Sequence, residues 1–381
     1  MIELIQDPLK LRALLWPPKD ELDGIYDLQE EVIWSVEFNK RTVLPAANKM
    51  GKDWIASWII VTLAIRCVLA SRAFGSKVKF RIVTTSATDE HLDVLWAEID
   101  NRIRESKWPL RAENGGLFHC SHHRIVLANA EMEKEPDSYI IGRVAKSGSR
   151  GEGLSGHHGD VTLAAVDEAS GSPDVVENMV GGWAKRELIW GNCNPCTNFF
   201  FYDTEAGDKL REPGQSSETV CDMMGVPDIA KPAQTYLRRV IHMPASASPN
   251  IKFGLEQQRR GLKPTGKCIL RGVMSWQEYQ DHLATCDPAQ LSVKLLAKFY
   301  KGSQVMLWPP DWLARCAMLA GERSRIESRR KEHGLPPLVR TMGVDGAEGG
   351  DSTCWCIGDD LGVLALVSVK TPDTNEIIGM T

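Results

Sequence analysis

The stretch that decides the fold covers residues 45–53 and reads Pro45-Ala46-Ala47-Asn48-Lys49-Met50-Gly51-Lys52-Asp53. It lies between an apolar strand pattern over 42–44 and an apolar helix pattern that begins at Trp54. A strand that turns sharply into a helix directs free backbone N–H groups and the positive end of the helix dipole at one point, where Lys52 adds an ammonium group. This arrangement favours a polyphosphate ligand. Ala46 and Asp53 depart from the common G-x-x-x-x-G-K-[ST] pattern, so this stretch alone also fits an ordinary surface turn.

A second pattern follows about one hundred residues later. Residues 161–166 form a continuous apolar run of strand length, and the acids Asp167 and Glu168 come directly after it. In such a pair the first acid can orient magnesium through its water shell, while Glu168 polarises the attacking water. The alternative is a helix N-cap with a glutamate in the first turn. The loop and the strand, in this order, favour a nucleotide hydrolase.

Composition sets wider limits on the class of protein. The chain has 381 residues, of which 43% are apolar and 25% charged, as expected for a globular protein with room for two domains. The net charge of −5 does not suggest a nucleic-acid binder, although residues 323–331 are locally basic. Ten cysteines without framework spacing, and an N-terminus without a signal peptide, predict free thiols in a reducing cytosol.

Three further motifs are assigned to packing rather than to chemistry. Cys193 and Cys196 lack a second cysteine pair, and the cluster over 119–123 is too crowded along the chain for a standard zinc site. The apolar stretch over 54–65 is shorter than the ~20 residues that span a bilayer. We therefore expect a buried helix there and no membrane segment.

Strand and helix patterns alternate along the chain in the manner of an α/β fold. Further strands are predicted over 78–83, 124–127 and 187–190, and a helix with one apolar face follows the first of them. The strand over 187–190 leads into Gly191-Asn192-Cys193-Asn194-Pro195. Asn192 and Asn194 there can sense a γ-phosphate or simply form a turn, and both interpretations stay open. The predicted fold is a P-loop NTPase with a central, mainly parallel sheet.

The domain boundaries follow from where the pattern changes. From residue 246 prolines make the chain irregular, and a charged segment over 321–333 ends at Gly334-Leu335-Pro336-Pro337 before a fresh apolar strand over 339–344. We predict an ATPase domain over 1–320 with an irregular subdomain over about 246–320, a linker over 321–338, and a second domain over 339–381.

With these elements in this order, the chain resembles the large terminase subunit of tailed bacteriophages, the motor that packages viral DNA into a procapsid. Gln29 is similar to the family's adenine-reading glutamine, since an amide can both donate to and accept from an adenine edge. Residues 153–169 are similar to the approach to the family's Walker B strand, and 191–195 to its coupling motif. The resemblance implies ATP and Mg²⁺ as cofactors, with Asp53 and Asp167 toward the metal.

The last segment is similar to the opening of the family's ribonuclease-H-like nuclease domain. Residues 342–353 carry this similarity, and Asp345 would be the first ligand of a two-metal site. Only one strand-turn-strand unit fits between Asp345 and Thr381, so we expect the later acidic ligands to be missing, the nuclease half to be truncated, and this chain not to cut DNA.

One departure from the family pattern concerns positive charge at the phosphates. Many members carry an arginine four residues before the loop lysine, where this chain has Asn48. Arg143 and Arg150, in the segment before the acid pair, are candidates by position, and solvated loop arginines are the alternative.

The sequence thus predicts the ATP-driven translocase of a phage DNA-packaging motor. The resemblance implies double-stranded DNA, a portal protein and a small terminase subunit as partners, a homo-oligomeric ring on the procapsid, and the host cytoplasm as location. A helicase-type, nucleic-acid-dependent ATPase and a non-catalytic prophage remnant are the alternatives.

Overall fold

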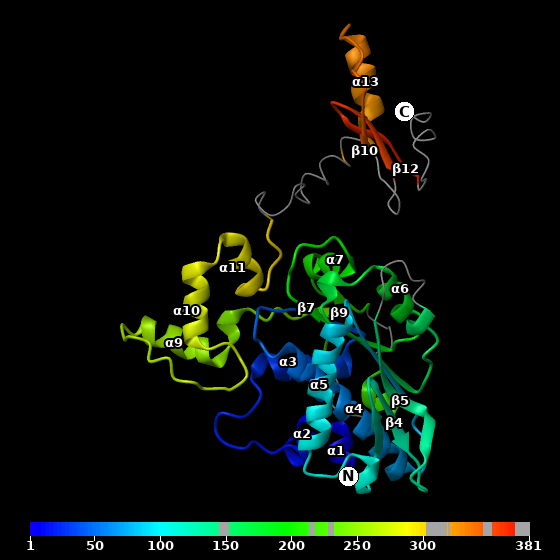
Figure 1. The fold of residues 1–381 in the computed structure, drawn as a ribbon, viewed down its shortest axis with the longest axis vertical. Helices are drawn as coiled ribbons and strands as arrows, with labels where there is room; N and C mark the ends of the chain where they lie inside the picture. The colour runs from blue at the N-terminus through cyan, green and yellow to red at the C-terminus, as the bar shows by residue number, and fades with distance from the viewer. Residues whose placement is uncertain are drawn as a thin grey trace. The chain divides into compact units, whose positions relative to one another are not determined.

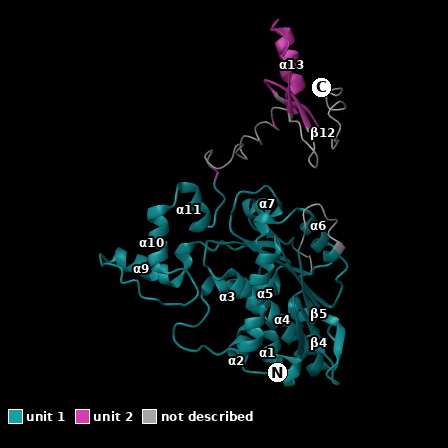
Figure 2. Ribbon diagram, viewed as in Figure 1, with its two compact units in different colours: residues 1–300 teal, residues 301–381 magenta. Residues whose placement is uncertain are grey.

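The chain separates into two compact units in a computed structural model (Figures 1 and 2). Residues 1–300 form the first unit and residues 301–381 the second. The structure describes residues 1–144, 152–212, 218–227, 232–301, 318, 321–345 and 353–369. Each unit is treated by itself. The finer domain division that the sequence suggests stays a prediction.

The first unit is built on a nine-stranded sheet, with the strand order β3-β4-β5-β2-β6-β7-β1-β9-β8. The six strands from β5 to β9 along this order pair in parallel, while β3, β4 and β8 pair antiparallel at the two ends. The α/β class with a mainly parallel central sheet is therefore confirmed. The strands are β1 (Arg41–Pro45), β2 (Phe80–Ser86), β3 (Phe118–Ser121), β4 (Arg124–Ala128), β5 (Lys134–Val144), β6 (Val161–Val166), β7 (Arg186–Gly191), β8 (Lys209–Leu210) and β9 (Tyr236–Val240).

The strand order decides which loops meet. Strand β7 lies between β1, which leads into the predicted phosphate loop, and β6, which ends at the acid pair. All three run parallel, so their carboxyl ends reach the same edge of the sheet, where ligands bind in open α/β folds. The loop after β7 therefore lies between the other two.

Strand β2 differs from its prediction at both ends. It begins two residues after the predicted start, at Phe80, and continues past the predicted end through Thr84, Thr85 and Ser86, whose hydroxyl side chains can also stabilise turns. Both neighbours, β5 and β6, offer hydrogen-bond partners along this stretch, so the three hydroxyl residues are buried within the sheet. Position in the sheet overrides their turn preference here.

Helices cover both faces of this sheet. In the first unit they are α1 (Ile2–Gln6), α2 (Pro8–Leu15), α3 (Asp27–Phe38), α4 (Lys52–Phe74), α5 (Asp89–Glu105), α6 (Val175–Gly181), α7 (Phe199–Ala206), α8 (Val220–Met223), α9 (Pro249–Arg259), α10 (Trp276–Thr285) and α11 (Pro288–Lys294). Short 3-10 turns occur at Ala112–Asn114, Glu152–Leu154, Ala169–Gly171 and Ala245–Ala247.

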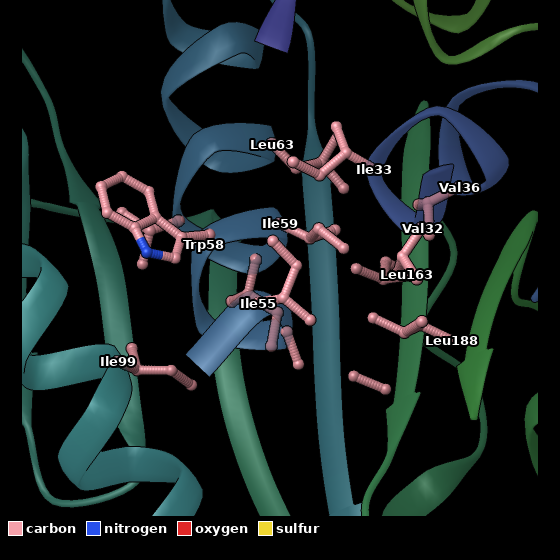
Figure 3. Packing of buried hydrophobic residues seen from close by; sticks show 14 of the residues in the cluster. Val32, Ile33, Val36, Ile55, Trp58, Ile59, Leu63, Ile99, Leu163 and Leu188 are labelled. Carbon is pink, nitrogen blue, oxygen red and sulfur yellow. The ribbon is translucent and has the colours of Figure 1, made fainter. Parts of the chain in front are cut away.

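Helix α4 is buried nearly all round. It begins at Lys52, two residues before the predicted start, and ends at Gly75, whose φ of 66° is left-handed. By length and composition it could cross a membrane, but 89% of its apolar window is buried inside the protein. Figure 3 shows its residues Ile55, Trp58, Ile59 and Leu63 among side chains of α3, α5, β6 and β7. A core helix explains the apolar stretch.

A second core lies on the opposite face of the sheet. Along β1, Leu44 belongs to the α4 side and Val43 to the other core, as the alternation of a strand requires. Val166 and Ile189 from β6 and β7 join Val43 there, together with side chains of α6 and α7. Because both faces are covered, β6 is buried along its whole length, which is why its continuous apolar run predicted a buried strand.

The irregular segment after β9 forms a small helical subdomain of α9, α10 and α11. Two backbone hydrogen bonds attach it to the predicted phosphate loop: Asn48 N–H donates to Lys294 O at 3.0 Å, and Met274 N–H donates to Lys49 O at 2.8 Å. This subdomain therefore holds the loop from outside the sheet.

The second unit contains one helix and three antiparallel strands among its described residues. They are α13 (Arg323–Glu332), β10 (Thr341–Asp345), β11 (Thr353–Asp359) and β12 (Gly362–Val369). Asp345 is the last residue of β10 and pairs with Cys354 in the ladder. Three strands occur about where the sequence predicted them, while kinship to a ribonuclease-H-like domain stays a prediction.

Candidate nucleotide-binding site

The turn from β1 into α4 has the geometry of an anion-binding loop. Lys49 and Gly51 have left-handed φ values of 52° and 73°, and Gly51 is the N-cap of α4. A Cβ on Gly51 would lie 2.7 Å from Gln29 Nε2, so a larger residue would displace Gln29 and strain the left-handed backbone. Successive N–H groups in such alternating conformations form a concave nest for an anion.

The backbone N–H groups of this loop fall into two sets. Those of Ala46, Ala47 and Asn48 donate to the carbonyls of Gly191, Met243 and Lys294. Those of Lys49, Met50 and Gly51 make no hydrogen bond within the described part of the chain. The donors available to a phosphate therefore belong to the second half of the predicted loop, next to the helix N-terminus.

Lys52 connects the loop to the acid pair. Its Nζ lies 3.1 Å from Glu168 Oε1 and 3.7 Å from Asp53 Oδ2, and the three side chains are only 15–26% exposed. Burial lowers the pKa of Lys52, but the charges of Asp53, Glu168 and Asp167 together raise it above its ordinary value. The lysine is thus a fixed cation. The structure brings the two sequence patterns into direct contact.

The acid pair forms a tight turn at the end of β6. Asp167 is 3% exposed, and its Oδ1 accepts the Glu168 N–H at 2.7 Å. Glu168 has φ 44° and ψ 49°, a left-handed conformation that is uncommon for a glutamate and is often found at functional sites. Asp167 does not act as the helix N-cap that we considered from the sequence.

Negative charge exceeds positive charge in this cluster. Burial and the neighbouring carboxylate of Asp53 raise the pKa of Asp167, Lys52 opposes them, and Glu168 raises it further. Three carboxylates surround one lysine, and carboxylate oxygens are the ligands that Mg²⁺ prefers. The donor set therefore fits a magnesium ion at Asp53 and Asp167.

Asp53 occupies the first turn of α4. Because the helix begins at Lys52 with Gly51 as its N-cap, Asp53 is not the residue that caps it. Its Oδ1 accepts a hydrogen bond from Trp190 Nε1 at 2.7 Å. Trp190 belongs to β7, so the strand between loop and acids fixes the carboxylate at the position where a magnesium-binding hydroxyl would stand.

Of the two asparagines predicted in the loop after β7, Asn192 contacts the loop after β1 and Asn194 does not. Asn192 Nδ2 donates to Ala46 O and to Asn48 Oδ1, both at 2.9 Å. The Asn194 side chain is exposed, and within the described residues only its backbone N–H is bonded, to Asn192 O. Asn192 therefore links the strand end to the phosphate loop, whereas Asn194 does not.

Asn198 is a residue that sequence reasoning missed. It caps α7, and its Nδ2 donates to the carbonyls of Ala169 and Ser172, each at 2.7 Å. Ala169 follows Glu168 directly, and Ser172 ends the short turn after it. Asn198 therefore ties the turn of the acid pair to the first residues of α7, and its place four residues after Asn194 gave no signal of this contact.

Gln29 lies next to the loop, and its role in reading adenine stays a prediction. Its side chain is buried, and Nε2 donates weakly to Met50 O at 3.4 Å, while Tyr26 Oη donates to the same carbonyl at 3.1 Å. The Gln29 Oε1 atom is buried without a hydrogen-bond partner among the described residues. An unpaired acceptor of this kind suits a donor from a ligand.

A cavity of about 460 Å³ opens over the loop. It is lined by Asn48, Lys49, Lys52, Asn192 and three residues of α10, namely Glu278, Asp281 and His282. Glu278 pairs with Lys49, and that contact, with hydrogen bonds from Ser275, lowers the Glu278 pKa to about 2. The sequence offered only the capping box of Ser275 and Glu278 as a signal for α10.

Two sets of predicted residues are not part of this cluster. Asp345 belongs to the second unit, and its role stays a prediction. Arg143 is an exposed residue near the end of β5, while Arg150 lies outside the described residues. No arginine is found among the residues lining the cavity over the loop.

The first unit thus places a strand-loop-helix turn with free backbone N–H groups and an acid pair at the same sheet edge, an arrangement typical of P-loop proteins. No protein-family model matches the chain, and no curated protein does. Solved structures that resemble it are large terminases, the family that the sequence motifs resemble.

The structural likeness is distant. The large terminase ATPase domain of Thermus phage P74-26 is 15% identical with a TM-score of 0.44, and the match covers 76% of this chain and 98% of that one. A variant of that domain is 14% identical, with a TM-score of 0.45. The large terminase of bacteriophage HK97 is 13% identical with a TM-score of 0.43, and the match covers 94% of this chain but 65% of that one. At these levels the likeness carries no argument about function.

Proposed function

We propose that the first unit binds ATP with Mg²⁺ and hydrolyses it. The observation that carries this proposal is the 3.1 Å contact between Lys52 Nζ and Glu168 Oε1, which joins a phosphate-binding loop to a candidate general base. Phosphoryl transfer needs few covalent steps from a protein, and depends on positioning and on charges close to the phosphates. The described cluster supplies both.

Each residue has a distinct role in this proposal. The N–H groups of residues 49–51 and the Lys52 ammonium hold the β- and γ-phosphates. Asp53 and Asp167 hold the magnesium ion, directly or through water, and the ion neutralises charge on the phosphates. Gln29 Oε1 accepts a hydrogen bond from the adenine amino group. Glu168 polarises the attacking water.

The contact between Lys52 and Glu168 also determines when Glu168 can act as a base. Glu168 cannot act as a base while its carboxylate is paired with the lysine, because the ion pair stabilises the charged form. When Lys52 turns to the phosphates, Glu168 is released toward the water. ATP binding and base activation are therefore linked through one side chain.

We further propose that this ATPase drives DNA translocation in a phage packaging motor. This step rests on the motif resemblance and on the contacts of Asn192 and Asn198, which join the loop after β7 to the phosphate loop and to the acid pair. Such contacts suit transmission of the nucleotide state to α7. The partners in this proposal are double-stranded DNA, a portal protein and a small terminase subunit. Copies of the chain form a ring on the procapsid, in the host cytoplasm. Asp345 is proposed as the first metal ligand of a nuclease site.

The test is turnover by the purified chain with and without DNA. We expect Mg²⁺-dependent release of phosphate from ATP, lost together with ATP binding in Lys52→Ala. Stimulation by a portal or small-subunit partner would distinguish a packaging motor from a helicase-type ATPase, which needs only nucleic acid. Normal ATP binding without turnover under every condition would favour the non-catalytic remnant and contradict the proposal.

A further inference from the structure

Two histidines and an aspartate meet at a second cavity, far along the sheet from the phosphate loop. The cavity has a volume of about 380 Å³ and lies between α5 and the hairpin of β3 and β4. Asp93 comes from α5, while His122 and His123 form the turn of the hairpin. One ligand atom from each of the three residues lies within 4.8 Å of the other two.

The spacing of these atoms is close to that of a metal site. Asp93 Oδ1 lies 2.7 Å from His123 Nε2 and 4.0 Å from His122 Nε2. In a tetrahedral zinc site, bonds of about 2.0–2.1 Å place neighbouring ligand atoms about 3.3 Å apart. The observed separations lie on both sides of that value, so small side-chain movements would bring all three atoms to one cation.

His123 is held in place from several sides. Its backbone has a left-handed φ of 49°, and its carbonyl accepts a hydrogen bond from Gly142 N–H at 2.9 Å. Its ring packs 5.5 Å from the Trp96 ring, and Trp96 Nε1 is in turn fixed by Thr84 Oγ1 at 2.9 Å. The ring position is therefore set by the fold before any ligand arrives.

The environment of His123 Nε2 points to a missing partner. This atom is buried and makes no aligned hydrogen bond in the described part of the chain, although Asp93 Oδ1 is only 2.7 Å away. A nitrogen and a carboxylate oxygen that approach so closely without an aligned N–H can share a cation. His122 stacks on His123 at 3.8 Å, and its side chain is 83% exposed, so it is free to turn its Nε2 to the same ion.

We propose that Asp93, His122 and His123 bind a divalent transition-metal cation of the zinc class. Two imidazole nitrogens and one carboxylate favour such a cation over Mg²⁺, which prefers oxygen ligands. Three protein ligands leave a coordination position open to water. The ion would join α5 to the hairpin of β3 and β4, since one ligand comes from the helix and two from the turn.

The sequence could not reveal this set. The histidines are adjacent in the chain, which argued against a standard zinc site, and their third partner is about thirty positions earlier on a separate helix. Only the packing of α5 against the hairpin brings Asp93 to them. The proposal does not depend on nucleotide binding, because none of its three residues lines the cavity over the phosphate loop.

The test measures Zn²⁺ binding to metal-free protein in competition with a chromophoric chelator. We expect one Zn²⁺ per chain, bound at least tenfold more weakly by His122→Ala and by Asp93→Asn. His119→Ala is the matched control, because His119 belongs to the same hairpin but its Nε2 contacts Met132 O at 2.8 Å. This control should bind Zn²⁺ as the unchanged chain does. A rise in melting temperature with Zn²⁺ should also disappear in His122→Ala.

Two results would overturn the proposal. One is unchanged affinity in both His122→Ala and Asp93→Asn. The other is loss of the bound zinc in His282→Ala instead, since His282 Nδ1 lies 3.5 Å from Cys286 Sγ and offers a competing nitrogen–sulfur pair. His122→Ala should retain ATP turnover with Mg²⁺, so failure of the zinc site and failure of the proposed ATPase can be distinguished.

Discussion

The two sheets of this protein differ in how far their apolar side chains are buried. In the first unit, Leu188 and Ile189 of β7 point to opposite faces and both are buried, because helices cover each face. In the second unit, β12 exposes Leu366 by 69% and Val367 by 48%. The first sheet is covered on both faces within its own unit and presents a loop and an acid pair at one edge. The second exposes apolar side chains that would pack well against a partner.

The largest expected effect separates the acids of the two sheets. Glu168→Gln should keep ATP binding but lower turnover about 10²- to 10⁴-fold, because an amide cannot accept the proton of the attacking water. Asp345→Asn, at the end of β10 in the other unit, should leave ATP turnover unchanged. Phosphate release and nucleotide affinity are the measurements. Equal loss in both variants would contradict the division of roles between the sheets.

Core substitutions test the difference in packing. Leu188→Ala should destabilise the first unit by about 2–5 kcal/mol, because it opens a cavity in a covered sheet. Leu366→Ala should change stability by less than about 0.5 kcal/mol in the isolated chain, since most of this side chain is exposed. Denaturant unfolding, followed separately for each unit, measures the free-energy cost of each substitution. A cost at Leu366 similar to that at Leu188 would mean that a second chain covers β12.

A smaller effect concerns the crowded carboxylates around Lys52. The pKa of Asp167 is higher in the folded chain than in the unfolded chain. Ionisation of Asp167 therefore destabilises the ligand-free fold progressively as the pH rises above the pKa of the unfolded chain. Asp167→Asn should therefore raise the free energy of unfolding at pH 8 by about 1 kcal/mol or more, and with it the melting temperature. Near pH 4 the substitution should have no such effect.

Magnesium provides the control for this prediction. Adding Mg²⁺ at pH 8 should stabilise the unchanged chain and not the Asp167→Asn variant, because the cation offsets the same negative charge. A melting-temperature gain in Asp167→Asn that is equal at both pH values would show that packing, and not charge, causes it.

The smallest expected effect is at the exposed pair of Lys49 and Glu278. Glu278→Gln keeps the capping box with Ser275, so it removes the ion pair without removing the cap. We expect a loss of less than about 1 kcal/mol, reduced further by salt. Because the Glu278 pKa is lowered to about 2, this stabilisation is present at neutral pH and is lost as pH falls from about 4.5 toward 2.

Asp281→Asn is the matched variant for that measurement. It changes a carboxylate in the same cavity that bonds to Gln277 on its own helix. Melting curves are recorded at low and at high salt for both variants. The change in stability should depend on salt for Glu278→Gln and not for Asp281→Asn. The same salt response in Asp281→Asn would point to the general field of the cavity.

The sequence predicted the parts of the fold that local patterns encode. Strand β6 has the predicted bounds because both its faces are apolar and Asp167 ends the run. The predicted, mainly parallel sheet implied that the loop after β1 and the acids after β6 share one edge. The position of β7 between those two strands was not predicted, because strand order depends on pairing between distant residues. Trp190, which fixes Asp53, and Asn198 entered the site only through that order.

Other differences have local physical causes. Helix α4 begins at Lys52 because Gly51 adopts a left-handed conformation that a propensity argument does not locate. Glu278 belongs to a subdomain whose prolines obscured its helices, so the wall of the cavity opposite the loop could not be inferred. Asp93 reaches the two histidines by packing between a helix and a hairpin.

The pairing of β1 with β7 has a consequence for how the chain is made. Arg41 and Glu187, neighbours in the sheet, are 146 residues apart. At ribosomal rates of about 5–20 residues per second, their partner strand emerges about 7 to 30 s after β1. For most of that interval α4, with a mean hydropathy of 1.8 over its apolar window, lacks the strands β6 and β7, whose Leu163 and Leu188 belong to the same core in the finished protein. The nascent chain therefore presents a membrane-like helix to chaperones and bilayers well before it can fold around it.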